Sequence, residues 1–171
     1  MRYLPIITLI ITLLASCQTN SDKSNVSADV EEHTEKPVIS IDTTTPKVTG
    51  IGGVFFYSDQ PEKTKAWYSQ NLGIIINDWG SSSFESRDIN DSEKINSLQW
   101  KPFKTGDQYF SPSEQPFMIN YQVQNIEALV SQLKENGVTI LDSIVAYEGI
   151  GKFVHIMDEE DNKIELWEPE Y

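Results

Sequence analysis

His155 and Glu165 are the two residues whose types and spacing could do chemistry. Each lies in a run of strand-like composition, residues 152–157 and 163–167, and an acidic turn separates the runs. If this hairpin is symmetric about Glu160, His155 and Glu165 lie directly opposite each other on one face, with Cβ atoms about 5 Å apart. A carboxylate beside an imidazole orients the ring and raises its pKa, which prepares a general base. We therefore predict a catalytic or ligand-contacting pair, with a structural hydrogen-bonded pair as the alternative.

The composition limits the chemistry of the chain. It has two histidines, His33 and His155, and one cysteine, Cys17, which excludes an internal disulfide framework, a zinc ribbon and a multi-histidine metal cluster. The pair His155 and Glu165 could still supply two ligands to a weak metal site. Lysine and arginine number 13 against 26 acidic residues, and the resulting net charge of −13 argues against nucleic acid as a partner.

The elements that must position these residues form two similar units. Every tryptophan and phenylalanine follows residue 50, so we expect the core, including the four tryptophans, to lie there. In the first unit, Asp59 and Glu62 predict a capping box for a helix with an apolar stripe that ends at Gly73. The strands predicted in this unit cover residues 50–57, 74–76, 82–86 and 95–103.

The second unit repeats this order. Asn125 is predicted to cap a helix with apolar residues at helical spacing, and Gly137 to end it. The strands predicted in this unit cover residues 117–123, 138–145, 152–157 and 163–167. Between the units, the polar loop 104–115 could hold Tyr109 and Phe110 over a small ligand. The pattern predicts an α+β fold made of two βαβββ modules, at about residues 48–112 and 116–171.

The N-terminal residues are predicted to form a targeting signal. The run 4–14 is apolar, follows Arg2 and is too short to span about 30 Å of hydrocarbon. Leu14-Ala15-Ser16-Cys17 resembles the bacterial lipobox. The resemblance implies that residues 1–17 are a lipoprotein signal peptide, that Cys17 is acylated, and that the domain is anchored to a bacterial membrane in the cell envelope, outside the cytoplasm. An ordinary cleavable signal with an incidental cysteine is the alternative.

Residues 18–47 are predicted to form a flexible tether between this anchor and the domain. The segment is rich in Ser, Thr, Asp, Glu, Asn and Lys and contains no aromatic residue, so it cannot bury enough apolar surface to offset its ordering entropy. A flexible chain of this length spans roughly 30 Å. The domain proper is therefore expected over residues 48–171.

Three stretches of this domain resemble the vicinal-oxygen-chelate superfamily, which includes glyoxalase I, bleomycin-resistance proteins, extradiol dioxygenases and methylmalonyl-CoA epimerase. They are Gly52–Phe56, Ala66–Tyr68 with Asn71–Gly73, and the final hairpin Asp158–Pro169. The resemblance implies a half-open cleft between two modules that holds a substrate and, in many members, a divalent metal. Because modules of this superfamily often complete clefts between chains, a homodimer is one expected form.

The metal ligands of the superfamily lie on the first and last strands of each module. Carried over to this chain, these positions fall on Gly53, about Gln99, about Met118, and Glu165. Glycine offers no ligand and a thioether suits these metals poorly. We therefore expect no metal cofactor, with Glu165, His155 and Gln99 as weak candidate ligands.

These positions define the functional hypotheses. We expect the cleft to bind a small organic molecule without the full metal site, by sequestering it or by acting on it through His155 and Glu165. The residues predicted to line the cleft beside this pair are Gln99, Trp100, Met118 and Trp167. A metal-dependent lyase, isomerase or dioxygenase is one alternative, and a surface lipoprotein that serves as a protein-interaction module is another.

Overall fold

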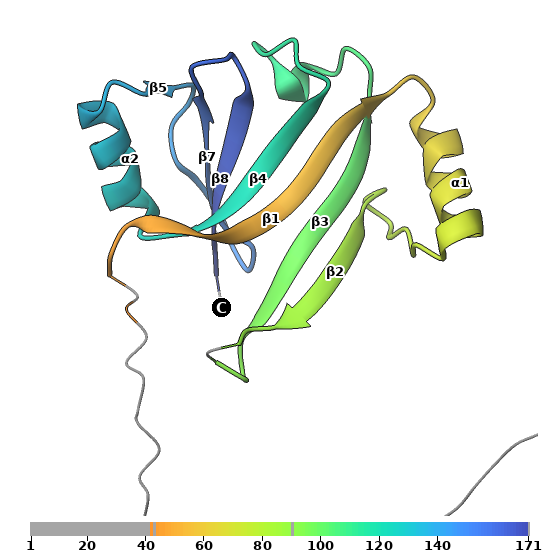
Figure 1. The fold of residues 1–171 in the computed structure, drawn as a ribbon, viewed down its shortest axis with the longest axis horizontal. Helices are drawn as coiled ribbons and strands as arrows, with labels where there is room; N and C mark the ends of the chain where they lie inside the picture. The colour runs from red at the N-terminus through yellow and green to blue at the C-terminus, as the bar shows by residue number, and fades with distance from the viewer. Residues whose placement is uncertain (1–41, 43, 90, 171) are drawn as a thin grey trace, which may run out of the picture. The chain divides into compact units, whose positions relative to one another are not determined.

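The computed structural model describes residues 42, 44–89 and 91–170, and it contains one curved sheet with two α-helices (Figure 1). The elements in chain order are β1 (Lys47–Ser58), α1 (Pro61–Leu72), β2 (Ser82–Arg87), β3 (Ile95–Lys104), the 3₁₀ turn η1 (Gln108–Phe110), β4 (Phe117–Gln124), α2 (Ile126–Glu135), β5 (Thr139–Ile140), β6 (Val145–Tyr147), β7 (Gly151–Met157) and β8 (Lys163–Pro169). The strands lie in the order β2-β3-β1-β4-β8-β7-β5, and β6 also pairs with β7.

The two halves of the sheet repeat one arrangement, which confirms the predicted α+β class. In the first half β1 runs parallel to β3, and β2 pairs antiparallel with β3. In the second half β4 runs parallel to β8, and β7 pairs antiparallel with β8. Each helix follows the first strand of its half, and the antiparallel pair of β1 and β4 joins the halves in the middle of the sheet (Figure 1).

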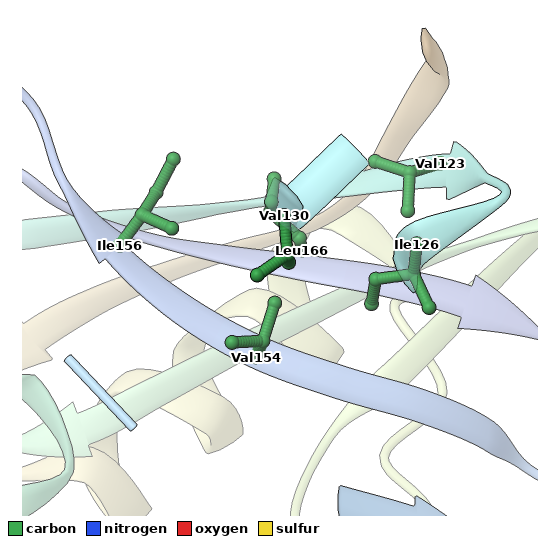
Figure 2. Packing of buried hydrophobic residues seen from close by; sticks show 6 residues of the cluster. All are labelled: Val123, Ile126, Val130, Val154, Ile156 and Leu166. Carbon is green, nitrogen blue, oxygen red and sulfur yellow. The ribbon is translucent and has the colours of Figure 1, made fainter. Parts of the chain in front are cut away.

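Helix α2 covers the main apolar core. Asn125 caps the helix as predicted, because its side-chain oxygen accepts a hydrogen bond from the Ala128 N–H at 3.4 Å. The buried side chains of α2 pack against alternate residues of β4, β7 and β8 (Figure 2). The members of this cluster are Val123, Ile126, Val130, Val154, Ile156 and Leu166. Since alternate residues of a strand point to opposite faces, the intervening residues of these strands face away from α2.

Helix α1 differs from its sequence-based expectation. It has no buried residue, and Trp67 and Leu72 are 55% and 60% exposed. The predicted capping box is also wrong, because Gln60 occupies the N-cap and makes no side-chain cap bond. Gly73 does end the helix, in the left-handed conformation at φ 69° that favours glycine. The predicted apolar stripe is therefore not a core face, and Trp79 is likewise 83% exposed.

One predicted strand is absent and another is interrupted. Residues 74–76 form no strand, and Ile75 is 83% exposed. The chain turns there instead, since the Asn77 side-chain oxygen accepts hydrogen bonds from the backbone N–H groups of Trp79 and Ser81. The predicted strand 138–145 breaks into β5 and β6, which both pair with β7.

The predicted signal peptide 1–17, the acylated Cys17 and most of the tether 18–47 lie outside the described residues. No helix within residues 42–170, as far as they are described, is long and apolar enough to cross a membrane.

Candidate functional site

One row of residues crosses five neighbouring strands at the same register. His155 pairs with Glu165, Glu165 with Asn120, Asn120 with Gly53, and Gly53 with Gln99. Paired residues of adjacent strands point to the same side of a sheet. This side is turned away from α2, because the alternating residues Val154 and Leu166 pack into the core that α2 covers. We call it the inner face, and we call His155, Glu165, Asn120, Gly53 and Gln99 the inner row.

Glu165 is the most heavily bonded residue of the inner row. Its side chain is 3% exposed. Oε1 accepts a hydrogen bond from the Tyr109 hydroxyl and lies 3.0 Å from Nε2 of His155, while Oε2 accepts one from the Asn120 amide. A buried carboxylate is tolerated when its lone pairs are occupied in this way. The burial and the neighbouring Glu165 both raise the pKa of the Tyr109 phenol, so this hydroxyl remains a donor.

His155 links Glu165 to a second carboxylate. Its Nδ1 lies 2.6 Å from Oδ2 of Asp142, and its backbone N–H donates to Asp142 Oδ1 at 2.8 Å. Burial alone lowers the pKa of His155, but the hydrogen bonds to Glu165 and Asp142 outweigh it, and the pKa is raised above its ordinary value. With both ring nitrogens facing carboxylates, the imidazolium form satisfies both contacts at once.

The connection between β3 and β4 lies against the inner face. Phe110 is fully buried and stacks on Tyr57 at 4.3 Å, within a small cluster that also contains Phe55 and Met118. Tyr109, the residue before it, reaches Glu165. The buried Lys163 donates hydrogen bonds to the carbonyls of Tyr109 and Ser111 at 2.7 and 3.1 Å, and burial lowers its pKa. The connection is thus held by a core side chain and by a buried cation.

The other end of the inner row is a network of neutral polar groups. The Gln99 amide nitrogen donates to the hydroxyls of Ser83 and Ser97 at 2.7 and 3.1 Å, and its carbonyl oxygen accepts from Ser81 at 3.4 Å. Ser83 pairs directly with Gln99 on β2, so it extends the row by one strand. This end is less covered than the Glu165 end, because Gln99 is half-buried and Ser83 is exposed.

The predicted site residues fall into three groups. His155, Glu165 and Gln99 lie together on the inner row, and Trp167 lies on the same face, two residues beyond Glu165, stacked on Phe153 at 5.9 Å. Met118 also points to this face, but it is 0% exposed beneath Phe110, so it is a core residue.

Trp100 lies on the opposite side of the sheet from its neighbour Gln99. Its ring contacts Phe56 and, at 4.8 Å, Tyr68 of α1. Adjacent residues of one strand cannot both face the cleft. The structure therefore separates Trp100 and Met118 from the accessible part of the inner face, and it leaves Gln99, His155, Glu165 and Trp167 as the predicted residues that it brings to this face.

Two contributors to the site were not predicted, and a third makes a different contact from the one expected. Asn120, rather than Met118, is the β4 residue opposite Gly53, and its side-chain oxygen is buried without a hydrogen-bond partner among the described residues. Asp142 lies in the connection after β5, and its contact with His155 has no local sequence signal. Tyr109 was expected over a ligand, and instead it donates a hydrogen bond to Glu165.

A cavity of about 630 Å³ lies beside the β3–β4 connection. It is lined by Tyr57, Asp59, Thr105, Gly106, Asp107, Gln108, Ser111, Ser113, Glu114 and Pro116. It contains no residue of the inner row, so it is separate from the site described above.

Comparison with solved structures places this geometry in a known fold. A variant of methylmalonyl-CoA epimerase from Streptomyces coelicolor, in complex with 2-nitronate-propionyl-CoA, is 13% identical and aligns over 73% of this chain and 100% of that chain with a TM-score of 0.53. A methylmalonyl-CoA epimerase in complex with methylmalonyl-CoA and NH4+ is 13% identical over 72% of this chain and 96% of that chain, with a TM-score of 0.52. The fold is vicinal-oxygen-chelate-like. The sequence matches no protein-family model and no curated protein.

This structural similarity establishes only the fold, because the sequence identity is low. Another solved structure, a glyoxalase/bleomycin resistance protein/dioxygenase superfamily member from Vibrio splendidus, is 11% identical over 72% of this chain and 99% of that chain, with a TM-score of 0.45.

The inner row does not fit the metal site that a vicinal-oxygen-chelate fold implies. The four positions that would face a shared ion, one on each of four adjacent strands, are Gly53, Gln99, Asn120 and Glu165. Both oxygens of Glu165 already accept hydrogen bonds from protein donors, and Gly53 has no side chain. Among the described residues, no three His, Cys, Asp or Glu side chains are grouped so that they could hold one ion. We therefore derive no chemical step through a metal.

Proposed function

We propose that this chain binds a small organic molecule on the inner face, and that it does so without a divalent metal. The observation that carries the proposal is the inner row itself. Hydrogen-bonding side chains from β7, β8, β4 and β3 point to one face at one register. Small-ligand sites typically combine a few placed polar groups with apolar and aromatic walls. Here Tyr109 and Trp167 supply aromatic surface on the same face.

The charge of the row favours a ligand with hydrogen-bond donors. Glu165 and Asp142 present carboxylate oxygens, and Gln99 presents an amide that already exchanges hydrogen bonds with serine hydroxyls. A ligand that donates N–H or O–H groups would replace a protein donor on one of these oxygens, whereas an anionic ligand would meet two carboxylates and the net charge of −13.

Binding is favoured over catalysis by the state of His155. A general base needs a ring nitrogen with a free lone pair within reach of the ligand. Both ring nitrogens of His155 lie within 3.0 Å of carboxylate oxygens, of Asp142 on one side and Glu165 on the other. We therefore assign His155 and Glu165 to ligand positioning, and catalysis by this pair would require one of the two contacts to break.

We further propose that acyl chains on Cys17 hold the protein at a bacterial membrane. The support is the lipobox-like sequence that precedes this cysteine and the polar segment that follows it. Several acyl chains give a stable anchor, whereas a single chain is only marginal. The proposed binding domain would then act in the cell envelope, on molecules that reach the membrane surface.

A thermal-shift screen of the full chain against a library of small organic molecules tests the binding proposal. A ligand that binds only the folded state raises Tm according to its concentration relative to Kd. We expect at least one compound to do so, and Gln99→Leu to weaken its affinity about tenfold, as the loss of one hydrogen-bonding amide implies. Gln132→Leu, at an exposed position of α2, is the matched control. Equal affinity in both variants would contradict the proposed site.

A further inference from the structure

Tyr109 occupies a place on the inner face that suits a planar ring with one hydrogen-bond donor. Its ring stacks on Phe103 with 5.2 Å between centroids and 5° between planes, and it meets the His155 ring edge-on at 5.6 Å. Lys163 Nζ lies 5.5 Å from the ring centroid. The hydroxyl donates to Oε1 of Glu165. Aromatic stacking, a cation over the ring and a buried acceptor thus converge on one side chain.

The backbone of Tyr109 is held by contacts that do not involve its side chain. Its N–H donates to Asp107 Oδ1 at 2.8 Å, and its carbonyl accepts from Lys163 at 2.7 Å. The next residue, Phe110, is fully buried and fixes the connection. Tyr109 itself is 38% exposed, so the residue is not enclosed by the fold. Rotation about the side-chain bonds would carry the ring outward while the backbone stays in place.

We propose that Tyr109 is a built-in competitor that holds the place of the ligand on Glu165. The inference rests on the proposed function and names the ligand class: an aromatic or heteroaromatic ring that carries an O–H or N–H donor. Such a ring would stack on Phe103 and donate to Glu165 Oε1 once Tyr109 has rotated out. A ring without a donor would leave that buried oxygen with His155 as its remaining partner, which is unfavourable.

Competition by Tyr109 sets the apparent affinity of the intact protein. When a binding-competent state is populated only in part, the apparent Kd rises in inverse proportion to its population. If the Tyr109 ring is in place for about 90–99% of the time, the ligand binds the wild type about 10–100-fold more weakly than it binds a protein that lacks this ring. Removal of the ring should therefore strengthen binding, although it removes protein contacts.

The test measures the binding of p-cresol, which copies the tyrosine side chain, to the full chain by calorimetry. We expect Tyr109→Ala to bind p-cresol at least about tenfold more tightly than the wild type does. Toluene has the same ring without the donor, and we expect it to bind Tyr109→Ala about tenfold more weakly than p-cresol. Tyr68→Ala removes a ring from the opposite side of the sheet and should behave as the wild type does.

A second variant covers the case in which Tyr109→Ala does not fold. Tyr109→Phe keeps the ring but loses the donor to Glu165, so p-cresol should displace it more easily than it displaces tyrosine. Unchanged p-cresol affinity in the folded variants, or equal affinity for p-cresol and toluene, overturns the proposal. The proposed function can survive that result, because the Gln99 test addresses the other end of the inner row. If p-cresol binds Tyr109→Ala more tightly than the wild type while Gln99→Leu leaves ligand affinity unchanged, the competition by Tyr109 is supported and the proposed contact of the ligand with Gln99 is contradicted.

Discussion

His155 Nε2 lies 3.0 Å from Oε1 of Glu165, and the two residues are direct partners in the β7–β8 hairpin. The same imidazole meets Asp142 through Nδ1. One ring therefore joins two carboxylates that would otherwise repel each other. Tyr109 and Asn120 complete the bonds to Glu165, so that the pair belongs to a network of four elements rather than to the hairpin alone.

The first prediction concerns pH. Because the pKa of His155 is raised in the folded state, its contribution to stability is fully present below its unfolded-state pKa of about 6.5 and is lost as the pH rises through the folded pKa. We expect His155→Gln to lower the free energy of unfolding by about 1–3 kcal/mol at pH 6. Urea unfolding at pH 6 and pH 9 should show a smaller difference between wild type and variant at pH 9. A difference that grows with pH would refute this.

Gly52 and Gly50 form a matched pair of substitutions on β1. A Cβ on Gly52 would overlap the Asn120 side-chain oxygen and lie 2.8 Å from Cε3 of Trp167, whereas a Cβ on Gly50 meets nothing within 4 Å. We expect Gly52→Ala to reduce the free energy of unfolding by about 1–3 kcal/mol through overpacking. Gly50→Ala should remain within about 0.5 kcal/mol of the wild type. Similar effects of both substitutions in denaturant titrations would show that the close packing of Gly52 against Asn120 is not needed for stability.

Lys163 and Lys152 test the support of the β3–β4 connection. Lys163→Met removes the donor to the carbonyls of Tyr109 and Ser111, and leaving buried carbonyls unpaired costs about 1–3 kcal/mol. Hydrogen exchange at the amides of Ser111 and Ser113 should accelerate. Lys152→Met breaks only partly exposed ion pairs and should cost at most about 1 kcal/mol. Unchanged exchange at Ser111 in Lys163→Met would mean that Phe110 alone holds the connection.

Elemental analysis tests whether the protein retains a divalent metal. The full chain, purified without chelator and dialysed against zinc, nickel and manganese in turn, should retain each metal well below one equivalent, since Glu165 is occupied by protein donors. A stoichiometric metal that is lost in Gln99→Leu would instead favour a metal-dependent lyase, isomerase or dioxygenase.

Cys17→Ser tests the proposed anchor, which lies outside the described residues. In bacterial cells that express the full chain, we expect the wild type to fractionate with membranes and to incorporate labelled fatty acid, and the variant to lose the label. Loss of one acylation site removes every chain that holds the protein to lipid. A membrane-bound, unlabelled wild type would contradict lipidation and favour another mode of attachment.

The hairpin partners could be predicted because their register depends only on a local turn. Once the turn is centred on Glu160, the opposition of His155 and Glu165 follows from strand geometry. The β4 partner of Gly53 could not be predicted in this way. The β1–β4 pairing has irregularities between Val48 and Gly50 and between Ile51 and Gly53, and it places Asn120 where Met118 was expected.

Apolar runs were the other source of error. Residues 74–76 have strand-like composition, yet they pair with nothing, and such short runs do not reveal whether a partner strand is available. The contacts of Asp142 and Tyr109 depend on how two connections far apart in the sequence meet the inner face. Sequence periodicity carries no information about where these connections meet, so the contacts of Asp142 with His155 and of Tyr109 with Glu165 are seen only in the three-dimensional structure.

The central place of β1 also bears on how the chain acquires its fold. This strand is bonded to β3 on one edge and to β4 on the other, and its register with β4 runs from Lys47 opposite Gln124 to Phe56 opposite Phe117. Neither half can complete its sheet before segments distant in the sequence have met. Proteins dominated by such non-local pairings cross the folding barrier slowly, so β1 should be among the last strands to gain its full complement of hydrogen bonds.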